Sequence, residues 1–445
     1  MERTPRLRRD TPGAFTSEAV AALRGVAASG RPPILLGYHP HFTTNPYQAL
    51  LYGRSREHGI APVAVDTVEQ LEELTALRRR GIETVLHLHW LHEILRDAES
   101  EADADHRART FLEIVDEHQG AGGRLVWTVH NILPHGAARE SAEARLSAAI
   151  ADRADVVHVL AATTPRLVAP YFELPTDRIL HVPHASYLGA YEDHVTRLDA
   201  RHELGLLPDE FVFAVVGAIR PYKGLTELLD AWQSATAVAP RRLVIAGQPS
   251  DEPGVQDLIE RAALDPTVLV DARKIPAPEM QLFLRAADVA ILPYLRSLNS
   301  GALALALTFG LPVIVPAGGG LAEVVDEGFA RTVRPGDPAD LRRAIEAAPS
   351  WVRPAASAAA RARAEELAPS IVAERFAVGL RDALDSVREP RRAPAARQVR
   401  LPAHTPEGGI GQVVAHPPTT RHRGARTPRP GGPIAAGAGR SAPEP

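Results

Sequence analysis

Two cations stand in a loop bounded by glycines, directly after an apolar run of the sequence. Residues 217–224 read Gly-Ala-Ile-Arg-Pro-Tyr-Lys-Gly and follow the run at 211–216. A glycine permits a tight turn, and the free N–H groups at the start of the next helix attract an anion. With Gly217, Arg220 and Lys223 at such a helix start, the loop is typical of a diphosphate-binding site. A surface loop with two solvated cations is the alternative.

Two further loops carry groups that suit the same ligand. Residues 293–302 precede an apolar helix, which Asn299 or Ser300 can cap, while Gly301 and Ala302 would present its free amides to an anion. Residues 318–323 place glycines and a carboxylate at the next strand end, so we expect sugar or ribose hydroxyls to meet Asn299, Gly319 and Glu323. Each loop alone is equally well explained by capping and turn formation.

Histidines gather at the ends of predicted strands in the N-terminal half: His39, His41, His87, His89 and His130. Imidazole titrates near neutral pH, so His130 is a candidate to orient a sugar, and His39 or His41 a candidate base. Asn45, Tyr47 and His89 are candidates for the acceptor side. A zinc site at His87, His89 and His92 is the alternative, but no thiolate or evident carboxylate completes it, and we assign no metal.

The composition excludes several classes of protein. The 445 residues include no cysteine, so disulfides, iron–sulfur clusters and cysteine nucleophiles are ruled out. A net charge of −4 argues against a nucleic-acid-binding protein. The arginine-rich start lacks a following apolar segment, and prolines break the uncharged run at 300–320, so we expect a soluble cytoplasmic protein.

Short apolar runs alternate with helical periodicity, which predicts an α/β protein with parallel sheets. The predicted strands form two series: 33–38, 61–65, 84–89, 124–129, 156–159 and 178–182, then 211–216, 242–246, 268–270, 289–292 and 312–315. We expect two Rossmann-like doubly wound domains that face each other across a cleft, where ligands bind at the strand ends. The expected organisation is a flexible extension (1–30), an N-terminal acceptor domain (31–192), a linker (193–208), a C-terminal donor domain (209–368), a closing helix (369–388) and a disordered tail rich in Pro, Gly and Arg (389–445).

These motifs resemble those of the GT-B glycosyltransferases, particularly the family 4 enzymes, also called glycosyl transferases group 1. The resemblance covers roughly residues 33–388 and rests on the 217–224 loop, on Gly310-Leu-Pro-Val-Ile, on His130 and on Val182-Pro-His184. It implies transfer of a hexose-type sugar from a nucleoside-diphosphate sugar, UDP- or GDP-linked, without a cofactor or catalytic metal. The acceptor would be a carbohydrate, a lipid-linked sugar or a small molecule, with peripheral membrane contact in the lipid case.

This sequence departs from the family pattern at three positions. Ala218 replaces the arginine after the loop glycine, and Ser297 and Leu305 replace two glutamates eight residues apart. Two other functions therefore stay open: a catalytically silent GT-B module that binds a nucleotide sugar or a partner, and a GT-B sugar-nucleotide epimerase, for which Lys274 is the spare lysine. The oligomeric state and the anomeric outcome are not predicted.

Overall fold

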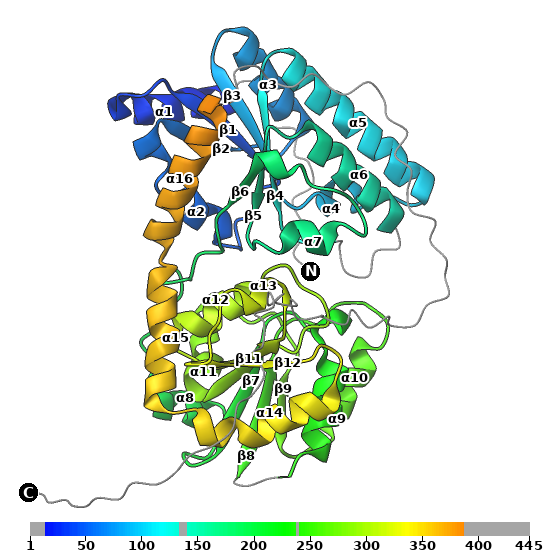
Figure 1. Ribbon diagram of the computed structural model, residues 1–445, viewed down its shortest axis with the longest axis vertical. Coiled ribbons are helices and arrows are strands. Elements are labelled where there is room, and N and C mark those ends of the chain that lie inside the picture. The colour runs from blue at the N-terminus through cyan, green and yellow to red at the C-terminus, as the bar shows by residue number, and fades with distance from the viewer. Residues whose placement is uncertain (1–13, 133–139, 237–239, 387–445) are drawn as a thin grey trace, which may run out of the picture. The chain divides into compact units, whose positions relative to one another are not determined.

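The computed structural model describes residues 14–132, 140–236 and 240–386, and these contain two parallel six-stranded sheets (Figure 1). The predicted disordered tail at 389–445 lies outside the described residues. Both sheets are built from β-strands that alternate with helices, so the predicted α/β class with two Rossmann-like sheets is confirmed.

The first sheet has the strand order β2-β1-β3-β4-β5-β6, with every neighbouring pair parallel. Its strands are β1 (Ile34–His39), β2 (Ile60–Ala64), β3 (Glu83–Leu88), β4 (Arg124–Val129), β5 (Val156–Val159) and β6 (Ile179–His181). The helices that follow them are α2 (Tyr47–Leu51), α3 (Val68–Arg79), α4 (His92–Leu95), α5 (Glu101–Gly120), α6 (Glu140–Arg153) and α7 (Thr164–Val168).

The second sheet repeats this construction with the order β12-β11-β10-β7-β8-β9. Its strands are β7 (Phe211–Val216), β8 (Arg241–Ala246), β9 (Val268–Asp271), β10 (Val289–Ile291), β11 (Val313–Pro316) and β12 (Ala330–Val333). One face packs against α9 (Leu225–Ser234), α10 (Val255–Ala263) and α14 (Pro338–Trp351), and the other against α8 (Arg197–Glu203), α11 (Met280–Ala286), α12 (Gly301–Thr308), α13 (Gly319–Ala322) and α15 (Pro354–Glu366). Because side chains alternate between the faces, Phe213 and Val215 of β7 join one core, and Val212 and Ala214 join the other.

Two elements were not predicted from the sequence. Residues 1–30 were expected to be a flexible extension, but Ala14–Val26 forms helix α1, which buries Phe15 and Ala19 in the core of the first sheet. Strand β12 was also missed, because its short sequence Ala-Arg-Thr-Val contains a charged residue and lies at the sheet edge, where apolar alternation is weak.

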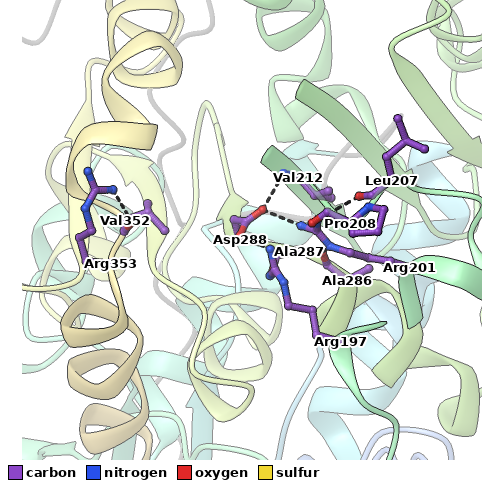
Figure 2. Close-up of polar contacts among 10 residues, drawn as sticks. All are labelled: Arg197, Arg201, Leu207, Pro208, Val212, Ala286, Ala287, Asp288, Val352 and Arg353. Atoms are coloured by element: carbon purple, nitrogen blue, oxygen red, sulfur yellow. Dashed lines mark hydrogen bonds and ion pairs between the residues drawn. The ribbon is translucent and has the colours of Figure 1, made fainter. Parts of the chain in front are cut away.

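The expected linker at 193–208 is largely ordered, because α8 packs against α11 of the second sheet. Arg201 of α8 is only 1% exposed and fastens this segment (Figure 2). Its guanidinium donates to the carbonyl oxygens of Ala286, Leu207 and Pro208 and, at 2.8 Å, to the Asp288 carboxylate. Asp288 also accepts from the Val212 amide and pairs with Arg197, so one partly buried carboxylate joins α8, β7 and the loop before β10.

The last described helix, α16 (Pro369–Ser386), packs on the first sheet rather than on the second, which precedes it in sequence. It contacts α2, β5 and β6, and Figure 1 shows it in orange beside α2. Phe376 of α16 is fully buried among Tyr52, His87 and His158. This helix therefore covers the histidine-bearing face of β3, β4 and β5.

Candidate active site

The loop between β7 and α9 is a compact turn that only glycine permits at its two ends. Gly217 and Gly224 have φ of 124° and 69°. A Cβ atom on Gly224 would lie 2.0 Å from the carbonyl oxygen of Pro293, so this position has no room for a side chain. The loop is thereby held against the segment that leads into α12.

Lys223 lies at the centre of this arrangement. Its side chain is 7% exposed, and its Nζ is 3.1 Å from where a Cβ of Gly217 would stand, while the Cβ of Ala302 is 4.0 Å from that same point. The end of β7, the lysine ammonium and the start of α12 are therefore brought together, as the sequence predicted for a diphosphate site.

No carboxylate pairs with Lys223 among the described residues, and the ring of Tyr294 lies 5.4 Å from its Nζ. Burial lowers the pKa of Lys223, because desolvation disfavours the ammonium. An anion placed beside Nζ would compensate this cost. The environment is thus suited to a negatively charged ligand.

Arg220 is less strictly held than Lys223. Its guanidinium is 43% exposed and lies 3.7 Å from the Glu252 carboxylate, which precedes α10. A diphosphate at this loop would compete with Glu252 for the arginine. Arg220 is therefore the solvent-exposed cation of the loop and could turn toward a ligand, whereas Lys223 is the buried one.

The start of α12 is capped from within its own chain. Ser300 is the N-cap, and its Oγ accepts from the amide of Leu303 at 3.1 Å and donates to the Tyr294 hydroxyl at 3.4 Å. The Tyr187 hydroxyl closes on the helix start, because a Cβ on Gly301 would lie 2.9 Å from it. Gly301 and Ala302 thus leave the first helical amides approachable from the Lys223 side.

Asn299 connects the start of α12 to the end of β4. Its Nδ2 donates to the carbonyl oxygen of His130 at 2.8 Å. His130 is 9% exposed, and its ring stacks on Trp90 with 4.1 Å between centroids. The backbone contact brings His130, predicted to orient a sugar, next to the helix predicted to bind the diphosphate.

The third predicted loop lies against the first sheet. Gly319 begins α13, and a Cβ there would be 3.5 Å from the Ser297 carbonyl oxygen. The carboxylate oxygens of Glu323 accept from the backbone amides of Ala162 and Thr163 at 2.7 and 2.8 Å. Glu323 therefore holds the start of α7, and it would have to exchange these amides for hydroxyls before binding a sugar or ribose as predicted.

The two candidate bases have different surroundings. His39 Nδ1 is 2.8 Å from the Val65 carbonyl oxygen, which fixes that nitrogen as a donor, and burial lowers the pKa of His39. The side chain of His41 is 29% exposed, and its Nδ1 lies 3.6 Å from Asp66 Oδ1. Because Nδ1 of His39 is committed to Val65, His41 is the preferred candidate base of the two.

The predicted acceptor-side residues do not present their side chains to solvent. Tyr47 and His89 are 4% and 0% exposed, and the ring nitrogens of His89 are hydrogen-bonded to Tyr52 and His130. Asn45 uses its Oδ1 to accept from the Tyr47 amide at 3.0 Å, which starts α2. Because Tyr47 and His89 are buried, direct contact of their side chains with an acceptor would require these rings to move, and it stays a prediction.

The described residues contain no group of three or more histidine, aspartate or glutamate side chains placed to hold a metal ion. His92, the third member of the alternative zinc set, pairs with Glu93 at 3.2 Å. The other two, His87 and His89, share a hydrogen bond with Tyr52 instead.

Two pockets adjoin these residues. One is lined by Asn299, Ser300 and Leu303 of the donor-side segment together with Leu160, His184 and Ser186. The other is lined by polar groups that include His92, Thr128, His130 and Asn131, beside Trp90. His130 borders the second pocket, and its neighbour in space, Asn299, borders the first.

Sequence reasoning overlooked several residues that shape the site. Tyr294 and Tyr187 contact the start of α12, and Glu252 holds Arg220. Tyr294 stands in a motif that the sequence analysis singled out, so its position was a usable signal. Tyr187 and Glu252 are distant in sequence from the groups they contact, and no local pattern points to them.

The geometry agrees with comparisons to known proteins. Residues 210–348 match the family described as glycosyl transferases group 1. The chain is 31% identical over 318 residues to the GDP-mannose:glycolipid 4-beta-D-mannosyltransferase of Xanthomonas campestris pv. campestris, a match that spans 70% of this chain and 82% of the relative. The chain belongs to the group 1 glycosyltransferases. It is a nucleotide-sugar-dependent glycosyltransferase, as the resemblance implied.

Other relatives of this glycosyltransferase agree. A D-inositol 3-phosphate glycosyltransferase of Geodermatophilus obscurus is 28% identical over 324 residues, which span 69% of this chain and 67% of the relative. Solved structures share the two-sheet GT-B fold. Sucrose-phosphate synthase from Thermosynechococcus elongatus has a TM-score of 0.60 and 17% identity, and Anabaena Alr3699/HepE in complex with UDP has 0.58 and 14%; each match covers 80% of this chain and 100% of the other.

In the part of the chain that the structure describes, no helix combines the length and the apolar character needed to cross a bilayer.

Proposed function

We propose that this glycosyltransferase transfers mannose from GDP-mannose to a hydroxyl group of a lipid-linked sugar. The proposal is supported by the relative that acts on GDP-mannose and a glycolipid, which matches along 82% of its own length. The inositol phosphate glycosyltransferases match over shorter stretches or at lower identity. GDP-mannose is therefore the donor to test first, ahead of UDP-sugars.

The observation that carries the donor chemistry is the convergence of Gly217, Lys223 and Ala302. A buried ammonium without a carboxylate partner among the described residues lies near the start of α12, and the ammonium and the helix start together would stabilise the charge that develops on the departing diphosphate. Arg220 would add a second cation when it leaves Glu252. Binding and leaving-group stabilisation would thus use the same groups.

The transfer breaks the bond between the sugar C1 and the diphosphate oxygen and forms a bond from C1 to the acceptor oxygen. The acceptor hydroxyl proton must pass to a base, and the electron pair of the broken bond stays on the nucleoside diphosphate. We assign the base to His41, whose side chain is 29% exposed and whose Nδ1 lies 3.6 Å from the Asp66 carboxylate. His130 and Asn299 would hold the transferred sugar between these two groups.

A lipid-linked acceptor would bring the protein to a membrane surface during turnover. Peripheral contact is therefore part of the proposal. Sedimentation with liposomes that contain or lack lipid-linked acceptor tests it, with binding expected to rise when the acceptor is present. Equal sedimentation with both liposomes would contradict the lipid-linked acceptor.

The donor is tested with purified full-length protein, a panel of GDP-mannose, GDP-fucose, UDP-glucose and UDP-N-acetylglucosamine, and acceptor lipids with a terminal sugar. We expect release of GDP and mass addition of one hexose to the lipid with GDP-mannose. If transfer occurs only from a UDP-sugar, GDP-mannose is not the donor, but the protein is still a glycosyltransferase. An isomerised donor without transfer would favour the epimerase, and binding without turnover would favour the silent module.

A further inference from the structure

An uninterrupted series of hydrogen bonds joins His130 to the carbonyl oxygen of Val182, the residue directly after β6, along one face of the first sheet. Starting from His130 Nε2, the successive distances are 3.0 Å to His89 Nδ1, 2.8 Å from His89 Nε2 to the Tyr52 hydroxyl, and 2.7 Å from there to His87 Nδ1. The series then runs 2.8 Å from His87 Nε2 to Thr128 Oγ1, 2.9 Å to His158 Nδ1, and 3.0 Å from His158 Nε2 to the carbonyl oxygen of Val182. We call these residues the histidine chain.

The alternation of side chains in β-strands produces this chain. His87 and His89 lie on one face of β3 and the residue that follows it, Thr128 and His130 lie likewise at the end of β4, and His158 lies on β5 between them and β6. Because the strands are parallel and adjacent, these side chains stand side by side. Tyr52, at the end of α2, bridges the two histidines of β3.

The chain is sealed from water. Tyr52 is 6% exposed, and His87, His89, Thr128 and His158 are 0% exposed. Phe376 of α16 stacks on His87 with 5.7 Å between centroids and contacts His158 at 5.0 Å. Burial lowers the pKa of each histidine in the chain, to about 4 for His158. These rings are therefore neutral near pH 7, and each carries one N–H and one lone pair.

One end of the chain fixes the direction of every bond. A carbonyl oxygen only accepts, so His158 Nε2 carries the proton and its Nδ1 must accept from the Thr128 hydroxyl. Thr128 Oγ1 then accepts from His87 Nε2–H, which leaves His87 Nδ1 to accept from the Tyr52 hydroxyl.

The same reasoning continues to the site. The Tyr52 oxygen accepts from His89 Nε2–H, so His89 Nδ1 accepts from His130 Nε2–H. His130 Nδ1 is then unprotonated. No described residue hydrogen-bonds this nitrogen, and His130 borders the pocket that also contains His92 and Asn131.

We propose that the Val182 carbonyl, acting through Tyr52, Thr128 and His158 as positioning residues, holds His130 in the tautomer whose Nδ1 is a hydrogen-bond acceptor for a substrate hydroxyl. In the opposite tautomer, Nδ1 would carry a proton and would present a donor to that hydroxyl. The histidine chain therefore determines that His130 accepts, rather than donates, the hydrogen bond to the substrate hydroxyl. This inference rests on the proposed function for the substrate, but the tautomer itself is a property of the free protein.

The test replaces Thr128 by Val, which keeps the side-chain shape and removes the hydroxyl, and by Ser, which restores it. Tyr52→Phe cuts the chain at a second point. Nitrogen-15 NMR of histidine-labelled full-length protein reports which ring nitrogen of His130 is protonated, with the signal assigned by its loss in His130→Gln. We expect the Nε2–H tautomer in the unaltered protein and in Thr128→Ser, and a mixture or the Nδ1–H tautomer in Thr128→Val and Tyr52→Phe.

Kinetics supply the second readout. We expect kcat/KM to fall about tenfold in Thr128→Val and Tyr52→Phe, as for loss of one buried hydrogen bond, and to stay within about twofold in Thr128→Ser. A change in KM for the donor rather than the acceptor would assign the hydroxyl to the transferred sugar, and the converse would assign it to the acceptor.

The inference is overturned if His130 carries its proton on Nδ1 in the unaltered protein, or if Thr128→Val leaves both its tautomer and the kinetics unchanged. Because the NMR measurement needs no substrate, it separates the two proposals. If the protein is inactive in every transfer assay but His130 carries its proton on Nε2, the proposed function is wrong and the inference about the tautomer still holds.

Discussion

The Asn299 side-chain amide donates to the His130 backbone carbonyl at 2.8 Å, which links the segment before α12 to the end of β4. Asn299 stands three residues before Ala302, whose Cβ borders the Lys223 and Gly217 turn. The group predicted to meet the sugar and the groups predicted to bind the diphosphate are thus connected through one hydrogen bond and a short stretch of chain. A change at Asn299 should therefore affect the predicted sugar-binding and diphosphate-binding groups together.

Replacing Asn299 by Ala removes the donor to His130, and Asn299→Asp places an acceptor against the carbonyl. We expect kcat/KM for the nucleotide sugar to fall about fivefold in the first variant, the equivalent of a hydrogen bond of about 1 kcal/mol, and further in the second because of repulsion. Steady-state kinetics check this order. Equal activity of the two variants and the unaltered protein would show that the link does not matter for transfer.

Replacing Lys223 by Ala should lower kcat about a hundredfold, because one preorganised charge is lost beside the leaving diphosphate. Lys223→Arg should recover little, since Lys223 is only 7% exposed and a planar guanidinium fork is larger than the compact ammonium. Lys274→Ala, in the chain's other lysine, is the matched control and should keep full activity. Steady-state kinetics measure kcat, and calorimetry measures the affinity for GDP. If Lys223→Ala keeps full activity, Lys223 does not bind the diphosphate.

His41→Gln and Asp66→Asn should each lower kcat with little effect on KM, because the pair acts on proton transfer rather than on binding. The loss should be about a hundredfold for His41→Gln and smaller for Asp66→Asn, which keeps the imidazole. Glu57→Gln, in a surface carboxylate paired with Arg54, serves as the control. If His39→Gln rather than His41→Gln abolishes turnover, the base is His39.

Arg201→Met and Arg197→Ala separate a buried from an exposed ion pair on the same carboxylate. Arg201 is 1% exposed, and its loss leaves three backbone carbonyl oxygens without their donor and Asp288 with Arg197 as its remaining cation, so it should lower the free energy of unfolding by about 3 kcal/mol or more. Arg197 is 44% exposed, so its replacement by Ala should lower the free energy of unfolding by less than about 1 kcal/mol. Urea unfolding of both variants tests the ranking, which a similar loss for the two would contradict.

Acid should destabilise the fold between about pH 6.5 and pH 4. Burial lowers the pKa values of His118 and His158 to about 4, whereas the unfolded chain binds these protons near pH 6.5. The unfolded state therefore gains protons first as the pH falls, and each histidine costs about 3 kcal/mol of stability across this range, with the full stability retained above it.

The measurement is urea unfolding at several pH values. His118→Asn should make the decline of stability with falling pH shallower, and His202→Gln, in an exposed histidine, should leave it unchanged. A free energy of unfolding that stays constant from pH 7 to pH 5 would show that the buried rings are protonated in the folded state.

The positions of most sheet strands along the chain, and the glycines and cations of the loop after β7, were readable from the sequence. Apolar runs such as 211–216 are buried on both faces, so they stand out locally, and the turn after β7 carries its glycines and cations within eight residues. Helix α1 and strand β12 escaped because neither has a long periodic apolar pattern, and their burial depends on the neighbours they meet. A sequence pattern predicts an element only when the residues of that element carry the pattern themselves.

Tertiary structure alone decided which polar groups meet. Glu323 was expected at a sugar and instead holds the amides of Ala162 and Thr163, which lie 160 residues away in the chain. The histidines of β3, β4 and β5 were recognised one strand at a time, but only the parallel pairing of these strands and the closing contact of Phe376 joined them into one buried chain. Hydrogen bonds between distant segments form where packing brings donors and acceptors within reach, and residue type and spacing by themselves do not fix those distances.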